Sequence, residues 1–274
     1  MAARSSPPAR VVIGLDVGTT SAKAAAFEPG TAWRRVASRE YPLLESTPGR
    51  QVQDPATIVA AARAALRECA AAIGHADVLA LSLSAGMHGL LALDEHEEPL
   101  TDLITWADGR AADVARRLHR EGRAPLLHVV TGVPVHPMSP LTKLLWFAEH
   151  DRATWLAARW WVGVKELLLL WLTGELATEL SSASATGLLD MRTCAWSDDA
   201  LELCSLEPER LAPILPTTAT LPLDDAVASD VGLPARTPVV VGAADGPLAN
   251  LGTGAIAPGV AALSLGTSGA VRMA

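Results

Sequence analysis

The chain has 274 residues, of which 50% are hydrophobic and 19% are charged, a composition that supports one large domain or two modest ones. A net charge of −8 and a pI near 5.4 argue against a nucleic-acid-binding protein, which would carry a basic surface. No apolar run reaches the roughly 20 residues that a membrane-spanning helix needs, and the N-terminus lacks the apolar core of a signal peptide. We therefore expect a cytoplasmic protein without membrane partners.

The number and spacing of the cysteines and lysines limit the kinds of site that the chain can carry. The three cysteines, Cys69, Cys194 and Cys204, are odd in number and lack C-x-x-C spacing, which suits a reducing compartment and indicates neither a disulfide framework nor a zinc site. Most of the basic residues are arginines, and the only lysines are Lys23, Lys143 and Lys165. Because an ammonium is a compact point charge that a planar guanidinium replaces poorly, each lysine is a candidate for a specific role, with chance as the alternative.

The first predicted elements are strands. Residues 1–10 are polar and contain prolines, which predicts a disordered lead-in. Apolar runs at 11–16 and 22–27 flank Gly-Thr-Thr-Ser and predict a β-hairpin, and 33–41 is a plausible third strand. Asp54-Pro55 places a cap and a first-turn proline before an alanine-rich helix that runs to about residue 73.

The rest of the chain alternates between predicted helices and strands. Residues 210–236 contain several prolines and predict an irregular connection. The tryptophans at 155, 160 and 161 are expected in the core rather than at a cofactor. Strands are predicted at 78–84, 90–93, 238–242 and 260–265, and helices at 108–121, 139–149, 151–158, 163–173 and 245–252.

Two turns rich in small and hydroxyl residues are candidate phosphate sites. In GLDVGTTSAK, Gly18 permits a tight turn, and Thr19, Thr20 and Ser21 add hydroxyls beside backbone N–H groups. Asp16 ends the preceding strand and could hold hydrated Mg²⁺, while Lys23 could add charge. A plain hairpin turn is the alternative. The second turn, Gly266-Thr267-Ser268, also follows a predicted strand, so the two turns could clamp a polyphosphate from opposite sides.

Asp245 follows a predicted strand and lies among small residues. Such a carboxylate could accept the proton of a substrate hydroxyl during phosphoryl transfer. The alternative is an N-cap aspartate for the helix that follows, and one residue can serve both roles.

A third group of residues suits a polyol or acid ligand. It comprises Met87, His88, Trp106, Asp108, Arg110, His136 and Lys143. His, Asp and Arg can bond hydroxyls or a carboxylate, and Trp106 can cover the apolar face of a sugar. The alternatives are a satisfied histidine, a capping Asp108 and a solvated Arg110.

Taken together, these segments resemble the FGGY family of carbohydrate kinases, within the actin-like superfamily of sugar kinases and ATPases. MSPLTKLLWFAEH, at 138–150, resembles the first family signature, and GLDVGTTSAK resembles its first phosphate motif. GAADGPLANLGTGAIAPG and LSLGTSG resemble the catalytic-aspartate and second phosphate motifs. MHGLLALD, LTDLITWADGR and SSASATGLLDMRT are similar to the gluconokinase type. Xylulokinases share Met-His-Gly and Asp-Gly-Arg but usually carry Trp-Asn where this chain has Trp106-Ala107.

The resemblance implies an α/β fold of the actin-like, ribonuclease H-like ATPase type. It implies a sugar-binding first lobe over residues 11–255 and the beginning of a nucleotide-binding lobe over 256–274. Family members are much longer, so we expect the adenosine site to be absent, the last strand to lack neighbours, and the chain alone to have little or no kinase activity.

The resemblance also implies roles for individual residues, with ATP and Mg²⁺ as cofactors. Asp16 would organise the metal, Gly18 to Ser21 with Lys23 and Gly266 to Ser268 would face the phosphates, and Asp245 would be the general base. The pocket for the sugar would contain Met87, His88, Trp106, Asp108 and Arg110, together with His136 and Lys143, although Lys143 could instead be structural.

Three functions follow from these roles. The first is phosphorylation of a sugar acid, D-gluconate to 6-phosphogluconate, at its primary hydroxyl. The second is a xylulokinase-like pentulose kinase, and the third is a sugar-binding lobe without catalysis. A homodimer is a candidate assembly. An actin-like chaperone or scaffold would leave the sugar-pocket motifs unexplained.

Overall fold

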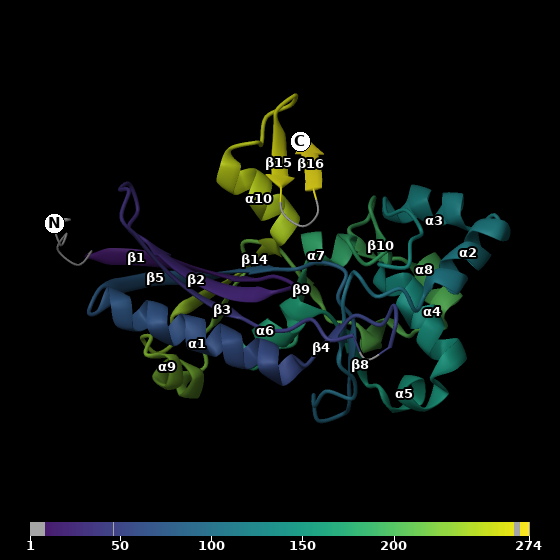
Figure 1. The fold of residues 1–274 in the computed structure, drawn as a ribbon, viewed down its shortest axis with the longest axis horizontal. Coiled ribbons are helices and arrows are strands. Elements are labelled where there is room, and N and C mark those ends of the chain that lie inside the picture. Colours follow the sequence, from purple (N-terminus) through teal and green to yellow (C-terminus); the bar gives the residue numbers. More distant parts are fainter. Residues whose placement is uncertain (1–8, 46, 266–268, 274) are drawn as a thin grey trace.

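A mixed six-stranded sheet forms the centre of the molecule in the computed structural model, which describes residues 9–45, 47–265 and 269–273 (Figure 1). The strand order is β13-β14-β5-β1-β2-β3. These strands are β1 (Arg10–Val17), β2 (Ser21–Phe27), β3 (Arg34–Glu40), β5 (Asp77–Ala85), β13 (Thr220–Pro222) and β14 (Pro238–Ala244). The three central strands β14, β5 and β1 are parallel, and antiparallel strands extend both edges. Parallel strands end at the same edge of a sheet, so their carboxyl ends meet.

The N-terminal hairpin is confirmed, and so is the third strand. β1 pairs with β2 in a register that sets Asp16 opposite Lys23. Alternate residues of β1 are buried, from Val11 to Val17, as expected of a strand with one face on the core.

Helices α1 (Pro55–Ile73), α6 (Val164–Thr173) and α9 (Asp225–Val231) pack together, α1 against β1, β2 and β3 and α6 against β5 and β14. Figure 1 shows α1 and α9 below the sheet. The predicted start of α1 is confirmed, because Asp54 accepts hydrogen bonds from the N–H groups of Ala56 and Thr57. Among the described helices none is both long and apolar enough to cross a membrane.

A second hydrophobic cluster lies beside the sheet and is built from short helices. The helices are α2 (Ala112–Arg120), α3 (Ala124–Thr131), α4 (Pro140–His150), α5 (Arg152–Ala157) and α8 (Asp198–Cys204). Trp155 and Trp161 are buried in this cluster, as predicted, and Trp160 packs partly buried against the main core.

Short strands and turns connect the two clusters. They are β4 (Val52–Gln53), β6 (Leu91–Leu93), β7 (Leu103–Ile104), β8 (Trp160–Val162), β9 (Thr178–Glu179), β10 (Leu189–Asp190), β11 (Ala195–Trp196), β12 (Ile214–Leu215), α7 (Leu180–Ser184) and a 3₁₀ helix (Pro208–Arg210).

Two stretches differ from the sequence expectation. The connection predicted at 210–236 contains β13, which adds an edge to the central sheet, and α9, which Asp224 caps. The helix predicted at 108–121 begins only at Ala112, and α3 follows it where a loop was expected. These elements have three to nine residues, too few for a clear hydrophobic period.

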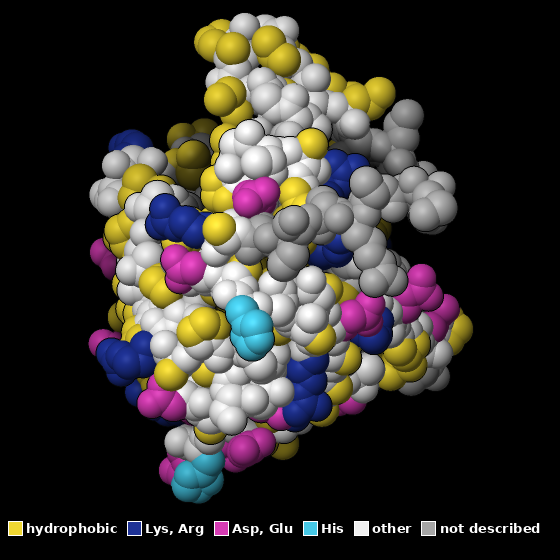
Figure 2. Space-filling view, turned by 90° about the vertical axis from the view of Figure 1, so that its left-hand side faces the viewer, with side chains coloured by type: hydrophobic (Ala, Val, Ile, Leu, Met, Phe, Trp, Pro, Cys, Tyr) yellow, Lys and Arg dark blue, Asp and Glu magenta, His cyan; other side chains and the backbone are white. Residues whose placement is uncertain are grey.

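The C-terminal part projects from the sheet above β14 (Figure 1). It consists of α10 (Asp245–Thr253), β15 (Ala261–Leu265) and β16 (Gly269–Met273). The expectation that the last strand would lack neighbours is wrong, because β15 and β16 pair as an antiparallel hairpin. Hydrophobic side chains gather on this end of the molecule (Figure 2), where Leu251, Leu263 and Val271 are more than half exposed.

Candidate functional site

Asp16, Ser84 and Asp245 meet where the three parallel strands end. Asp16 is opposite Ser84 in the β1–β5 register, and Ala244, the last residue of β14, is opposite Ala85. Ser84 Oγ donates a 2.7 Å hydrogen bond to Asp16 Oδ1. A cavity of about 360 Å³ opens here, and its lining consists of Asp16, Ser84, Asp245, Leu248, Ala249 and Arg272. The edge of the sheet therefore carries two carboxylates that face one cavity.

Asp245 has the surroundings of a general base. It is the first residue of α10, whose N-cap position is Ala244, so the alternative of a capping aspartate does not hold. Burial raises the pKa of Asp245, and the Asp16 carboxylate raises it further, while the Gly246 N–H and the Arg272 guanidinium oppose the shift. Oδ1 is buried without a hydrogen-bond partner among the described residues. A carboxylate of raised pKa facing a cavity is suited to accept a proton.

The turn after β1 is preformed by side chains from elsewhere in the chain. Gly18 N–H donates to Ser21 O at 3.1 Å, and the Tyr41 hydroxyl donates to Gly18 O. Thr19 is held twice: Gln53 Nε2 donates to its carbonyl at 2.5 Å, and Trp106 Nε1 donates to its hydroxyl at 3.0 Å. The main chain of the turn is therefore held in place by hydrogen bonds within the protein.

The other candidate phosphate residues fall into two groups. Thr20 and Lys23 are exposed, and Lys23 is opposite Asp16 on β2, so both side chains project from the same face of the sheet. Gly266, Thr267 and Ser268 lie outside the described residues.

The loop after β5 brings Met87 to the site. Met87 and Arg272 both line a second cavity of about 440 Å³. Gly246 makes room for these side chains, since a Cβ there would be 3.0 Å from Met87 Cε and 3.2 Å from Arg272 Nε. His88 adopts φ 65°, and its Nδ1 is 2.8 Å from Ala185 O. Burial lowers the pKa of His88 against the effect of that hydrogen bond, which favours the neutral ring. A neutral ring that donates from Nδ1 to Ala185 O has Nε2 as its acceptor.

Asp108 and Arg110 pair with each other. Arg110 Nε and Nη2 donate to the two oxygens of Asp108 at 2.8 and 2.9 Å, and the backbone N–H groups of Gln51 and Arg110 each add a bond at 2.9 Å. Asp108 is buried, and the Arg110 guanidinium stacks over the Trp146 ring. Asp108 is therefore not a helix cap and Arg110 is not solvated. The two side chains instead form a buried bidentate pair.

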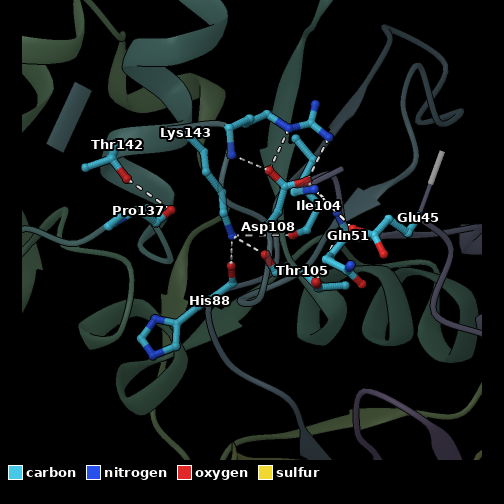
Figure 3. Close-up of polar contacts among 11 residues, drawn as sticks. Glu45, Gln51, His88, Ile104, Thr105, Asp108, Pro137, Thr142 and Lys143 are labelled. Atoms are coloured by element: carbon cyan, nitrogen blue, oxygen red, sulfur yellow. Dashed lines mark hydrogen bonds and ion pairs between the residues drawn. The ribbon is translucent and has the colours of Figure 1, made fainter. Parts of the chain in front are cut away.

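Lys143 and His136 lie around the start of α4. The Lys143 side chain is fully buried, and Nζ donates to His88 O at 2.5 Å and to Thr105 O at 2.8 Å (Figure 3). Burial lowers the pKa of this ammonium to about 7, although Asp108 acts in the opposite direction. This placement favours the structural alternative for Lys143. His136 is exposed, and its Nδ1 accepts a 3.2 Å hydrogen bond from Met138 N–H.

Sequence reasoning missed Gln53, Ser84 and Arg272. Ser84 had a usable signal, because it lies at the end of a predicted strand, and in the fold that strand is the parallel neighbour of the Asp16 strand. Gln53 and Arg272 are brought in by tertiary packing and had no local signal.

Comparison with known proteins identifies relatives of this chain. Residues 11–252 match the FGGY family of carbohydrate kinases, N-terminal domain. Gluconokinase from Bacillus subtilis (strain 168) is 34% identical over 262 residues, which are 95% of this chain and 51% of that protein. Xylulose kinase from Escherichia coli (strain K12) is 33% identical over 267 residues, 94% of this chain and 53% of that protein.

A solved structure of a similar protein contains a lobe with the fold of this chain. The crystal structure of gluconate kinase from Lactobacillus acidophilus superposes with a TM-score of 0.93 at 33% identity, over 96% of this chain and 54% of that one. The chain thus spans about half the length of these relatives. It has the mixed α/β fold of the N-terminal lobe of sugar kinases, and it belongs to the FGGY family of carbohydrate kinases.

Proposed function

We propose that this chain supplies the acceptor side of a kinase that transfers the γ-phosphoryl group of ATP to the primary hydroxyl of a sugar acid, with D-gluconate as the first candidate. The observation that carries the proposal is the meeting of Asp16 and Asp245 at one cavity beside the preformed turn of Thr19. The similarity to a gluconokinase over 95% of the chain supports gluconate as the acceptor.

In this proposal Asp245 would accept the proton of the acceptor hydroxyl while the hydroxyl oxygen bonds to the γ-phosphorus, the bond from that phosphorus to the β-phosphate oxygen breaks, and ADP leaves. The raised pKa of Asp245 makes it a better proton acceptor than an ordinary aspartate. The turn from Gly18 to Ser21, together with Lys23 and the residues Gly266, Thr267 and Ser268, would hold the phosphates. Phosphoryl transfer depends on such positioning more than on covalent chemistry.

The Asp16 side of the cavity fits a hydrated Mg²⁺ ion. Magnesium prefers one or two carboxylates and keeps several waters, and Asp16 supplies one carboxylate, oriented by Ser84, in a cavity with room for water. The ion would neutralise charge on the phosphates.

The acceptor would lie between the loop of Met87 and His88 and the indole of Trp106. His88 Nε2 would accept from a hydroxyl, and Trp106, which is 44% exposed, would cover the sugar. Asp108, Arg110 and Lys143 would act mainly by holding in place the side of the pocket that Met87, His88 and Trp106 form. His136 would lie at its outer rim. These contacts suit a six-carbon acid and a five-carbon ketose alike, so a xylulose-type ketose is the second candidate, supported by the similarity to a xylulose kinase.

The test is calorimetric titration of the chain with gluconate and with xylulose. We expect gluconate to bind more tightly, and binding of xylulose alone would favour the second candidate. The variant Asp245→Asn should retain most of the gluconate affinity of the chain, and in a full-length version that includes the second lobe it should abolish ATP-dependent phosphorylation. Absence of binding to both sugars would refute the proposed function.

A further inference from the structure

The ammonium group of Lys165 contacts a bend in the main chain just before Asp245. Only 2% of its surface is exposed, and it belongs to the first turn of α6. Its Nζ donates to Val241 O at 2.8 Å, to Ala243 O at 3.1 Å and to Leu83 O at 3.2 Å. Three N–H donors thus meet three carbonyl acceptors, which compensates for burying the ammonium group.

The ladder between β14 and β5 is irregular at this place. Its register shifts between Val240 and Ala243, and Gly242 has φ +73°. A Cβ on Gly242 would lie 1.8 Å from Leu83 O. Such a bulge bends a strand and takes carbonyl groups out of the ladder. The Lys165 ammonium bonds the carbonyls of Val241 and Ala243, on either side of Gly242, and so stabilises the bend.

A second contact holds the backbone N–H of Ala244, the residue that follows Ala243. Ala244 N–H donates to Ser181 Oγ at 2.8 Å, and the Ser181 hydroxyl donates to Glu179 Oε2 at 2.8 Å. Glu179 is buried and also accepts from Ser182 N–H at 3.0 Å. Because the Ser181 proton is committed to Glu179, its oxygen lone pairs face Ala244.

We propose that Lys165 and Ser181 are positioning residues that together set the direction in which Asp245 enters the cavity. The inference rests on the proposed role of Asp245 as the base. Asp245 begins α10, so its Cα–Cβ direction follows from the backbone of 241–244, where both contacts act. A displacement of about 1 Å at a reacting group can reduce a rate by about a hundredfold.

The experiment compares Ser181→Ala with Ser181→Thr, and Lys165→Met with Leu66→Ala. Threonine keeps the hydroxyl that alanine removes. Leu66 is buried under the sheet in α1, so its variant lowers global stability without touching this bend. The readouts are hydrogen exchange of the Ala244 amide and the ¹³C signal of the Asp245 carboxyl, assigned through Asp245→Asn, at one fixed pH.

We expect Ser181→Ala to accelerate exchange of the Ala244 amide about tenfold, since one hydrogen bond is lost, and to shift the Asp245 carboxyl signal. Lys165→Met should shift that signal too, whereas Ser181→Thr and Leu66→Ala should leave it in place. Unchanged signals in Ser181→Ala would overturn the proposal, as would an equal shift in Leu66→Ala. These readouts need no sugar, so a failure of the proposed function would appear separately, as the absence of gluconate binding.

Discussion

The indole N–H of Trp106 donates a 3.0 Å hydrogen bond to the hydroxyl of Thr19. Trp106 is an expected member of the sugar pocket, and Thr19 is in the expected phosphate turn. Gln53 reinforces the connection through the Thr19 carbonyl. A ligand that covers Trp106 would therefore also act on the turn.

The variant Trp106→Phe tests this connection, because phenylalanine keeps an aromatic face but has no N–H. We expect gluconate to change the tryptophan emission of the wild type and to change that of the variant much less. Exchange of the Thr19 and Thr20 amides should be faster in the variant. Equal emission changes in both proteins would show that Trp106 is not at the sugar.

Lys143 should contribute strongly to stability. In Lys143→Met the carbonyls of His88 and Thr105 lose their donor, and buried unsatisfied acceptors are costly. We expect a loss of about 2–4 kcal/mol in the free energy of unfolding, measured as a lower urea midpoint with an unchanged m-value. Lys23→Met, at an exposed position, is the control and should change stability by less than about 0.5 kcal/mol.

The same lysine predicts a pH dependence. Its pKa is lowered to about 7 in the folded chain, against about 10.4 when unfolded. Between these values the unfolded chain binds more protons, so the contribution of Lys143 to stability rises with pH. The difference in unfolding free energy between wild type and Lys143→Met should therefore grow from pH 6.5 to pH 9.5. A difference that shrinks over this range would contradict the lowered pKa.

Two glycines near the site should respond in opposite ways to alanine. Gly242→Ala places a Cβ against Leu83 O at φ +73°, so we expect a loss of about 4 kcal/mol or failure to fold. Gly252 lies in α10, where an added Cβ would meet no described atom within 4 Å, and its alanine variant should gain about 0.5–1 kcal/mol. Thermal unfolding of the two variants measures both effects, and a tolerated Gly242→Ala would rule out the bend at this residue.

The cysteines should differ in reactivity. Burial raises the pKa of Cys69 to about 11 and that of Cys204 to about 12, whereas Cys194 is exposed. A thiol reagent at pH 8 should modify one cysteine in the folded chain and three in urea, because the thiolate is the reactive form. Mass spectrometry should locate the modification at Cys194, and rapid labelling of Cys204 would contradict its burial.

Much of the site could be predicted from sequence because its residues follow predicted strands. Asp16 and Asp245 each come directly after an apolar run, and strand ends collect at one edge of a parallel sheet. The short helices and strands were harder to predict. The three residues of β13 extend the central sheet, yet their sequence, Thr-Leu-Pro, has no pattern of its own.

Partners distant in sequence could not be predicted. The abundance of arginine marked the lysines as unusual, but nothing local indicates that the Lys143 ammonium bonds the main chain of residues 88 and 105. Asp108 and Arg110 were expected as separate ligand groups, and only the fold shows that they bind each other. Side-chain chemistry predicts what a residue can bond, whereas the choice of partner depends on tertiary packing.

The order of strands in the sheet has a consequence for folding. β5 lies between β1 and β14, and β14 is separated from β5 along the chain by all the helices of the second cluster. Parallel pairing over such a separation is slow, because the entropy of closing a long loop is lost before contacts form. Asp16 and Ser84 can come together early during synthesis, while Asp245 joins them only after nearly all of these 274 residues have left the ribosome. We therefore expect the two carboxylates to meet late in the folding of this lobe.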